Sequence, residues 1–152
     1  MNNVMSKETL LYQLIWMSRP LMQNAEALVE AQLEGSGLTV RMRAVLEMLA
    51  DHGAATVPEI AEHLQIQRQY VQVMVNDCHA VDLVQKQPNA RHKRSMLIAL
   101  TQKGEGLIRR VMAQEQMVLA SFADEFDADA LESALRVTKM LTNRIQSYMK
   151  GS

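Results

Sequence analysis

The sequence is poor in cysteine and has no long hydrophobic run. Its 152 residues include one cysteine, Cys78, and one thiol can neither close an internal disulfide nor supply a thiolate metal site by itself. No stretch approaches the roughly 18 apolar residues of a membrane-spanning helix, and the N-terminus lacks the basic start and apolar core of a signal peptide. We therefore expect a cytoplasmic protein without a membrane span.

Aromatic residues are also scarce, at 4% of the chain, whereas methionine occurs 12 times. The core should therefore be aliphatic and rich in methionine, a side chain that tolerates irregular packing. A hydrophobic fraction of 48%, a charged fraction of 22% and the chain length are ordinary for one soluble globular domain. We expect residues 1–152 to form a single domain.

Catalytic patterns are missing as well. The four histidines, His52, His63, His79 and His92, are scattered, and no glycine-rich phosphate loop occurs. Cys78 and His79 are adjacent, and neighbours on a helix point about 100° apart, so they do not form a nucleophile–base pair. The sequence therefore predicts a protein that is not an enzyme and that uses neither a cofactor nor a metal.

Helical spacing of apolar residues dominates what is present. It predicts long helices at 6–34 and 102–123 and a last helix that starts at "FDADAL". Three shorter helices are expected between them: one from Thr39 to His52, one after Thr56, and one within "QRQYVQVMVNDCHAV". The expected N-caps are Ser6, Thr39, Thr56 and Thr101.

Strand alternation appears once, where Met96, Ile98 and Leu100 would share one face and Leu97 and Ala99 the other. A first strand near residues 83–87 would pair with it through "PNARHKR". The sequence therefore predicts a mainly α (α+β) fold, in which a winged helix-turn-helix lobe at 38–101 lies between long helices at 6–34 and 102–150. Those helices cannot bury all their apolar stripes on so small a middle, so we expect a homodimer in which they are the dimerisation helices.

The helix within "QRQYVQVMVNDCHAV" has the dimensions of a DNA-reading element. About 14 helical residues span roughly 21 Å, and such a helix fits a major groove about 12 Å wide. Val71, Val75 and Cys78 form its inward stripe. The amide side chains of Gln69, Gln72 and Asn76 lie elsewhere on it, and amides match the donor and acceptor pattern of base edges, adenine especially.

Positive charge gathers in the predicted hairpin although the whole chain has a formal net charge of -1. Residues 84–104 contain five cations and no acid: Lys86, Arg91, Lys93, Arg94 and Lys103. Between 105 and 132, by contrast, acids outnumber arginines. We expect a polarised field whose basic end meets double-stranded DNA, with Arg91, Lys93 and Arg94 contacting phosphates or a narrow minor groove.

Three segments together give the chain a family resemblance: "GLTVRMRAVLEML", "TVPEIAEHLQIQRQYVQVMVNDC" and "VDLVQKQPNARHKRSMLIALTQKG". In these segments and in the order of its elements the chain resembles the MarR family of winged helix-turn-helix transcription regulators. The resemblance implies a homodimer whose recognition helices enter successive major grooves. Carried over by position, the recognition helix would begin near Gln67, and the groove-facing residues would be Gln67, Arg68, Gln69, Tyr70 and Gln72. Arg94 matches the family's wing arginine.

The chain departs from the family pattern at two positions. His92 stands where many members have an aspartate that orients the wing, and Asp82 stands where a glycine usually follows the recognition helix. The resemblance also implies an effector pocket between the first helix and the DNA-binding lobe. Tyr12, Trp16 and Arg19, with Met42 and Met48 opposite, would suit a small aromatic or acidic effector. The alternative is that Trp16 and the methionines are dimer or domain core and that Arg19 is a solvated neighbour of Pro20.

Two alternatives to a ligand-responsive repressor are left open by the residues. One is a winged-helix protein–protein adaptor that does not bind DNA, although such an adaptor would not need an acid-free wing. The other is a thiol-sensing regulator that uses Cys78, although this residue falls on the inward stripe of its helix, where a small core side chain is expected.

Overall fold

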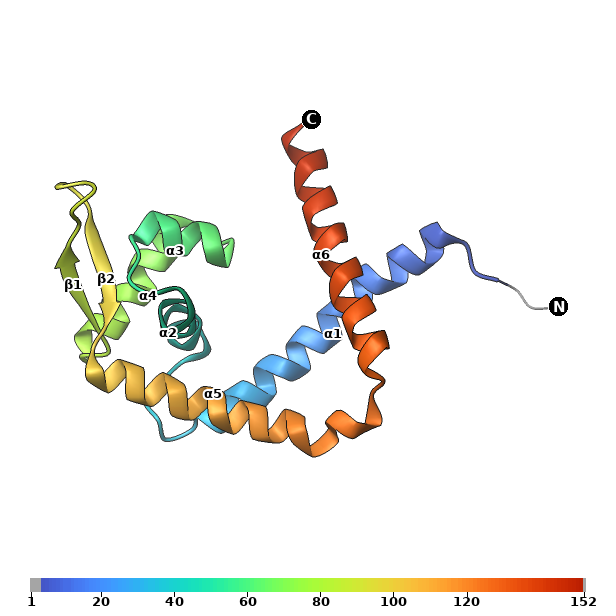
Figure 1. Ribbon diagram of the computed structural model, residues 1–152, viewed down its shortest axis with the longest axis horizontal. Coiled ribbons are helices and arrows are strands. Elements are labelled where there is room, and N and C mark those ends of the chain that lie inside the picture. Colours follow the sequence, from blue (N-terminus) through green and yellow to red (C-terminus); the bar gives the residue numbers. More distant parts are fainter. Residues whose placement is uncertain (1–3, 152) are drawn as a thin grey trace. The chain divides into compact units, whose positions relative to one another are not determined.

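The computed structural model describes residues 4–151 and is mainly helical, as predicted (Figure 1). Its elements, in chain order, are α1 (Lys7–Leu33), α2 (Val40–His52), α3 (Val57–Leu64), α4 (Arg68–Ala80), β1 (Val84–Pro88), β2 (Met96–Leu100), α5 (Gln102–Phe122), a short 3-10 turn η1 (Ala123–Glu125) and α6 (Ala128–Lys150). The predicted order of helices and hairpin is therefore confirmed.

The chain divides into two compact units. The first ends at Glu115, and the second begins at Gln116, so the boundary falls within α5. The core lies in the first unit, where α2, α3, α4 and the start of α5 bury aliphatic side chains. The fully buried members with the largest volumes are Leu46, Ile60, Leu83, Ile108, Val45, Val71, Val75, Val84 and Cys78.

The predicted N-caps are present. Ser6, Thr39 and Thr56 accept hydrogen bonds from the backbone N–H groups of Thr9, Met42 and Glu59, respectively. At α3 the cap is reciprocal, because the Glu59 carboxylate accepts from the Thr56 N–H at 2.7 Å and from its hydroxyl at 2.9 Å. This capping box fixes the start of the first helix of the helix-turn-helix.

The two strands pair antiparallel, with Val84 opposite Leu100 and Pro88 opposite Met96. A single bridge adds Ala55, which exchanges backbone hydrogen bonds with Ile98. The expected two-face alternation of β2 is not observed, since Ile98 and Ala99 are both buried while Met96 is exposed. Burial follows distance along the hairpin instead, because the base packs on the core and the tip projects from it.

The base of the hairpin is tied to the ends of α4 and α5. The Thr101 hydroxyl donates to the Asp82 carbonyl at 2.7 Å, and the Lys103 ammonium donates to the Val81 carbonyl at 2.8 Å. The Gly104 N–H in turn donates to the Thr101 hydroxyl at 3.0 Å, which fits the predicted cap. Asp82 has φ 60°, the left-handed conformation for which a glycine is the usual residue.

A second tie joins α2 to α5 within the first unit. The guanidinium of Arg43 forms ion pairs with Glu47 and with Glu115, and the side chains of Arg43 and Glu115 are only 16% and 15% exposed. Hydrogen bonding to Glu115 raises the pKa of Arg43 above its ordinary value despite its partial burial. The charge is therefore retained, and it fixes α5 against the helix-turn-helix core.

Candidate nucleic-acid interface

The turn before α4 orients the predicted recognition helix. Gln65 ends α3 in the left-handed conformation, and the Ile66 N–H bonds back to the Ala61 carbonyl at 3.1 Å. Gln67 is the N-cap residue of α4, although its side chain makes no capping hydrogen bond. The predicted start near Gln67 is therefore confirmed.

The face of α4 opposite the core carries polar and apolar side chains together. Val71, Met74, Val75 and Cys78 are buried, whereas the predicted contact residues Gln67, Arg68, Gln69, Tyr70, Gln72 and Asn76 are all exposed. The Gln72 amide donates from Nε2 to Oδ1 of Asn76 at 3.0 Å. Tyr70 and Val73 are 59% and 56% exposed, so this face also offers apolar surface.

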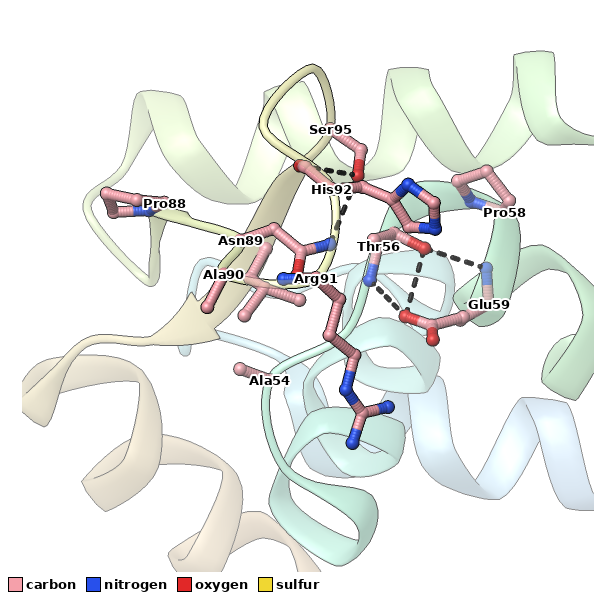
Figure 2. Close-up of a pocket in the computed structure, with 11 residues that line it drawn as sticks. Ala54, Thr56, Pro58, Glu59, Pro88, Asn89, Ala90, Arg91, His92 and Ser95 are labelled. Atoms are coloured by element: carbon pink, nitrogen blue, oxygen red, sulfur yellow. Dashed lines mark hydrogen bonds between the residues drawn. The ribbon is translucent and has the colours of Figure 1, made fainter.

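The tip of the wing is held by hydrogen bonds between neutral side chains (Figure 2). Asn89 donates from Nδ2 to the Ser95 hydroxyl at 3.1 Å and accepts the Arg91 N–H on Oδ1, also at 3.1 Å. Ser95 bonds back to the His92 carbonyl through both its N–H and its hydroxyl. In this chain, where His92 replaces the family's aspartate, Asn89 and Ser95 close the turn.

The cations of the wing are exposed and form no ion pair within residues 4–151. Arg91, Lys93 and Arg94 are exposed, and among residues 4–151 the ion pairs involve only Arg43 and Arg109 as cations. Arg91 is turned back over a cleft of about 610 Å³ between the wing and the start of α3, where Glu59 also lies (Figure 2). The pKa of Glu59 lies below its ordinary value because of the Thr56 N–H and hydroxyl first, with a smaller contribution from Arg91.

The predicted effector residues form an exposed cluster on α1. The rings of Tyr12 and Trp16 are 6.1 Å apart, and the Arg19 guanidinium lies 5.4 Å from the centre of the Trp16 ring. Met42 and Met48 are buried in the core, at 6% and 7% exposure, whereas Trp16 is 51% exposed. The aromatic and basic members therefore lie together, and the methionines belong to the packed interior instead of facing them.

Cys78 is fully buried, as its place on the inward stripe indicates. Burial raises the pKa of its thiol to about 12, with a further contribution from Asp77. A thiol of this kind reacts slowly because the thiolate is the reactive form.

Residues 4–151 contain neither a cluster of three metal-ligating side chains nor a helix long and apolar enough to cross a membrane. Asn89 and Ser95 were missed by the sequence reasoning. The "PN" turn signal was visible, but the bond between residues six apart depends on the path of the whole loop. Val73, which is exposed on the outward face of α4, was not assigned a role either.

The sequence profile of the MarR family matches residues 36–95. A curated relative, the HTH-type transcriptional repressor MdtR of Bacillus subtilis, is 23% identical over 130 residues, which cover 86% of this chain and 84% of MdtR. The structure of the MepR–DNA complex of S. aureus shares the fold at TM-score 0.73 and 20% identity, over 84% of this chain and 95% of MepR.

Another likeness extends over almost the whole chain. The crystal structure of the MarR family transcription regulator SP03579 is 32% identical and has a TM-score of 0.82, covering 96% of this chain and 97% of that one. The profile match covers the α2–α4 segment and most of the hairpin, which carry the exposed amides and the basic tip. The chain therefore belongs to the MarR family of winged helix-turn-helix, DNA-binding transcription regulators.

Proposed function

We propose that this protein is a homodimeric, sequence-specific transcription regulator that acts as a ligand-responsive repressor. The observation that carries the proposal is the pairing, on one unit, of an amide-rich exposed helix face with a basic hairpin tip that forms no ion pair within residues 4–151. A helix supplies base contacts in the major groove, and guanidinium and ammonium groups supply phosphate contacts. The similar repressor MdtR and the MepR–DNA complex support this assignment.

The roles of the residues divide between the two elements. Gln67, Arg68, Gln69, Tyr70, Gln72 and Asn76 on α4 would face base edges and the flanking phosphates. Arg91, Lys93 and Arg94 would contact the backbone or the adjacent minor groove. In the free protein Arg91 lies over the cleft that holds Glu59, so it would have to turn outward to reach DNA.

The apolar surface that is exposed in a single chain supports the proposal of a dimer. Residues 4–24 are all exposed, and α6 has no buried residue although Leu131, Leu135 and Ile145 are spaced as one helical stripe. We propose that residues 6–34 and 102–150 form the dimer interface around the DNA-binding lobes at 38–101. The twofold symmetry would then place two half-sites about 10 base pairs apart.

Regulation would come from the cluster of Tyr12, Trp16 and Arg19. An aromatic ring can stack on a planar ligand, and a guanidinium can pair with its carboxylate. A small aromatic or acidic effector bound there would release DNA only if it favours a conformation of the dimer that binds DNA less tightly. Exposed Trp16 gives this cluster its own fluorescence signal.

The salt dependence of DNA binding tests the proposal. Each phosphate contact that is lost lowers the slope of log affinity against log salt by about one. Arg94→Ala and Lys93→Ala should therefore weaken binding to specific and random duplexes alike and flatten that slope. Lys7→Ala, which removes a cation far from the wing in sequence, serves as the control. Variants of the wing with unchanged affinity and slope would show that the wing does not touch DNA.

The same titration distinguishes the adaptor alternative. A winged-helix adaptor without DNA binding should fail to shift any duplex, including the region upstream of its own gene, at moderate salt. A shift that is specific for one duplex and depends on Gln69 and Gln72 would exclude that alternative.

A further inference from the structure

The exposed face of α4 has an apolar side chain at its centre. Val73 lies one helical turn after Gln69 and one turn before Asn76, so these amides are its neighbours on the helix surface. It is 56% exposed, whereas Val71 and Val75 on the same helix are completely buried. Val73 therefore lies outside the core of the chain. Its methyl groups are exposed between the Gln69 and Asn76 amides, which suit base edges.

Gln72 is not a freely rotating side chain. One N–H of its amide donates to Oδ1 of Asn76 at 3.0 Å. Among residues 4–151, this bond leaves the second N–H and the Oε1 acceptor of Gln72, and the Nδ2 donors of Asn76, available to a ligand. Since an amide contains two N–H groups and two acceptor lone pairs, the bond consumes only a fraction of its capacity.

The groups that remain on Gln72 match one base. Adenine presents an acceptor at N7 beside a donor at N6 in the major groove, and an amide pairs with both by giving one N–H and accepting on its oxygen. Gln72 can make this bidentate contact while its other N–H stays on Asn76. A side chain held in place before binding loses less conformational entropy when it binds. Guanine, with two acceptors at N7 and O6, cannot satisfy the Gln72 oxygen.

Val73 supplies a complementary contact. The major-groove edge of an A·T pair also carries the C5 methyl group of thymine, which contacts apolar side chains. Val73 follows Gln72 directly and projects about 100° further around the helix, so it reaches a neighbouring part of the groove. The methyl groups of Val73 can therefore make an apolar contact with the C5 methyl group of a thymine.

We propose that α4 reads an A·T-containing step: Gln72, held by Asn76, contacts an adenine, and Val73 contacts the methyl group of a thymine. Asn76 is then a positioning residue for Gln72, and Val73 is a specificity-determining residue. This inference rests on the proposed DNA-binding function and specifies which bases that function recognises.

The test begins with sites selected by the full-length protein from duplexes that have a randomised core. Half-sites selected by the wild type should contain an adenine that is no longer enriched in sites selected by Gln72→Ala. Affinities are then measured by anisotropy for the selected duplex and for two kinds of altered duplex. The first kind has guanine in place of that adenine. The second is a series in which deoxyuridine replaces one thymine at a time.

Removal of one methyl group from the correct thymine should weaken binding of the wild type about fourfold, the value of one buried methyl contact. Val73→Ala should bind the thymine and uracil duplexes equally, and Val73→Thr, which keeps one of the methyl groups, should retain part of the difference. Urea midpoints equal to that of the wild type would show that these exposed substitutions leave the fold intact.

Asn76 is tested by the ratio of affinities for the adenine and guanine duplexes. Asn76→Ala should lower this ratio by at least about threefold, the value of one modest hydrogen bond. Asn76→Asp keeps the acceptor oxygen and should restore the ratio, although its charge weakens binding to every duplex. A role in stability alone would not alter the ratio.

Failure of the proposed DNA-binding function and failure of the roles of Val73 and Asn76 give different results. If no duplex is selected, the proposed function fails. If duplexes are selected but uracil has no effect at any position, the role of Val73 is overturned. If Asn76→Ala keeps the wild-type ratio, the role of Asn76 is overturned, however tightly the protein binds.

Discussion

At the scale of single residues, Cys78 shows how position determines chemistry. Its thiol lies on the buried face of α4 between the core and the recognition surface, and burial raises its pKa to about 12. A thiolate there would have to be desolvated, so the thiol stays protonated at neutral pH. This environment favours a packing role and argues against the thiol-sensing alternative.

The raised pKa predicts how stability depends on pH. Because the ordinary value for the thiol is 9.0 and the folded value is about 12, the protonated thiol stabilises the fold fully below about pH 9. Above that pH the unfolded chain loses this proton first, so the free energy of unfolding should fall more steeply in the wild type than in Cys78→Ala. Urea unfolding of both proteins, from neutral to alkaline pH, measures the difference. Parallel curves would show that Cys78 keeps an ordinary pKa.

Much of the residue pattern around α4 could be predicted from sequence. The stripe of Val71, Val75 and Cys78 defines the inward face, and the remaining positions are then outward by helical geometry. The ion pair of Arg43 with Glu115 could not be predicted, since 72 residues separate the partners and neither lies in a pattern that indicates the other. The burial of Met48 agrees with the alternative that the methionines belong to the core, which sequence could not decide because a methionine fits a core or a pocket equally well by composition.

At the scale of elements, the junction of α4, the hairpin and α5 explains the closing "LTQKG" segment. Leu100 pairs with Val84, Thr101 and Lys103 bind the carbonyls at the end of α4, and Gly104 lies against the backbone of Leu83. The start of α5 is therefore tied to the end of the recognition helix by both side-chain and backbone contacts. Sequence alone shows the segment, but it does not show which neighbour forbids a side chain at position 104.

Gly104→Ala should destabilise the protein by about 1–3 kcal/mol, the range of an overpacked core. A Cβ atom there would lie 2.0 Å from the Leu83 carbonyl oxygen, and backbone atoms cannot move aside as a flexible side chain does. Denaturant unfolding measures the loss.

A second glycine in the same helix provides the control. At Gly106 a Cβ atom would meet only the Arg110 guanidinium, at 3.5 Å. Gly106→Ala should therefore stabilise α5 by up to about 1 kcal/mol, because alanine is the better helix former. Equal effects of the two substitutions would contradict the proposed contact with Leu83.

At the scale of the whole molecule, two of the long helices leave extended apolar surface exposed. On α6, Leu131 is 47%, Leu135 is 61% and Ile145 is 45% exposed, and the first three turns of α1 contain Leu10, Leu11 and Leu14 in a similar state. Extended apolar surface of this kind marks an interface. A second copy of the chain is the cover that we propose.

Leu135→Asp should convert the dimer into monomers at concentrations where the wild type is dimeric. The side chain is exposed in the single chain, so an aspartate there leaves the fold of the protomer intact, but in the interface its charge would be buried without a partner. Ser133→Asp, which places the same charge on the opposite side of α6, should remain dimeric. Sedimentation distinguishes the species, and a dimeric Leu135→Asp variant would place the interface elsewhere.

Effector and DNA should affect each other by the same factor if the cluster on α1 regulates the dimer. Binding free energies are reciprocal, so a ligand that weakens DNA binding by a given factor must itself bind the DNA complex more weakly by that factor.

Salicylate, a planar aromatic acid, is a suitable probe. Its affinity is read from Trp16 emission with and without duplex, and DNA affinity from a labelled duplex with and without salicylate. Arg19→Ala should abolish both effects, because it removes the cation over the Trp16 ring, whereas Lys7→Ala should preserve them. Constant Trp16 emission while salicylate still releases DNA would place the effector site away from α1.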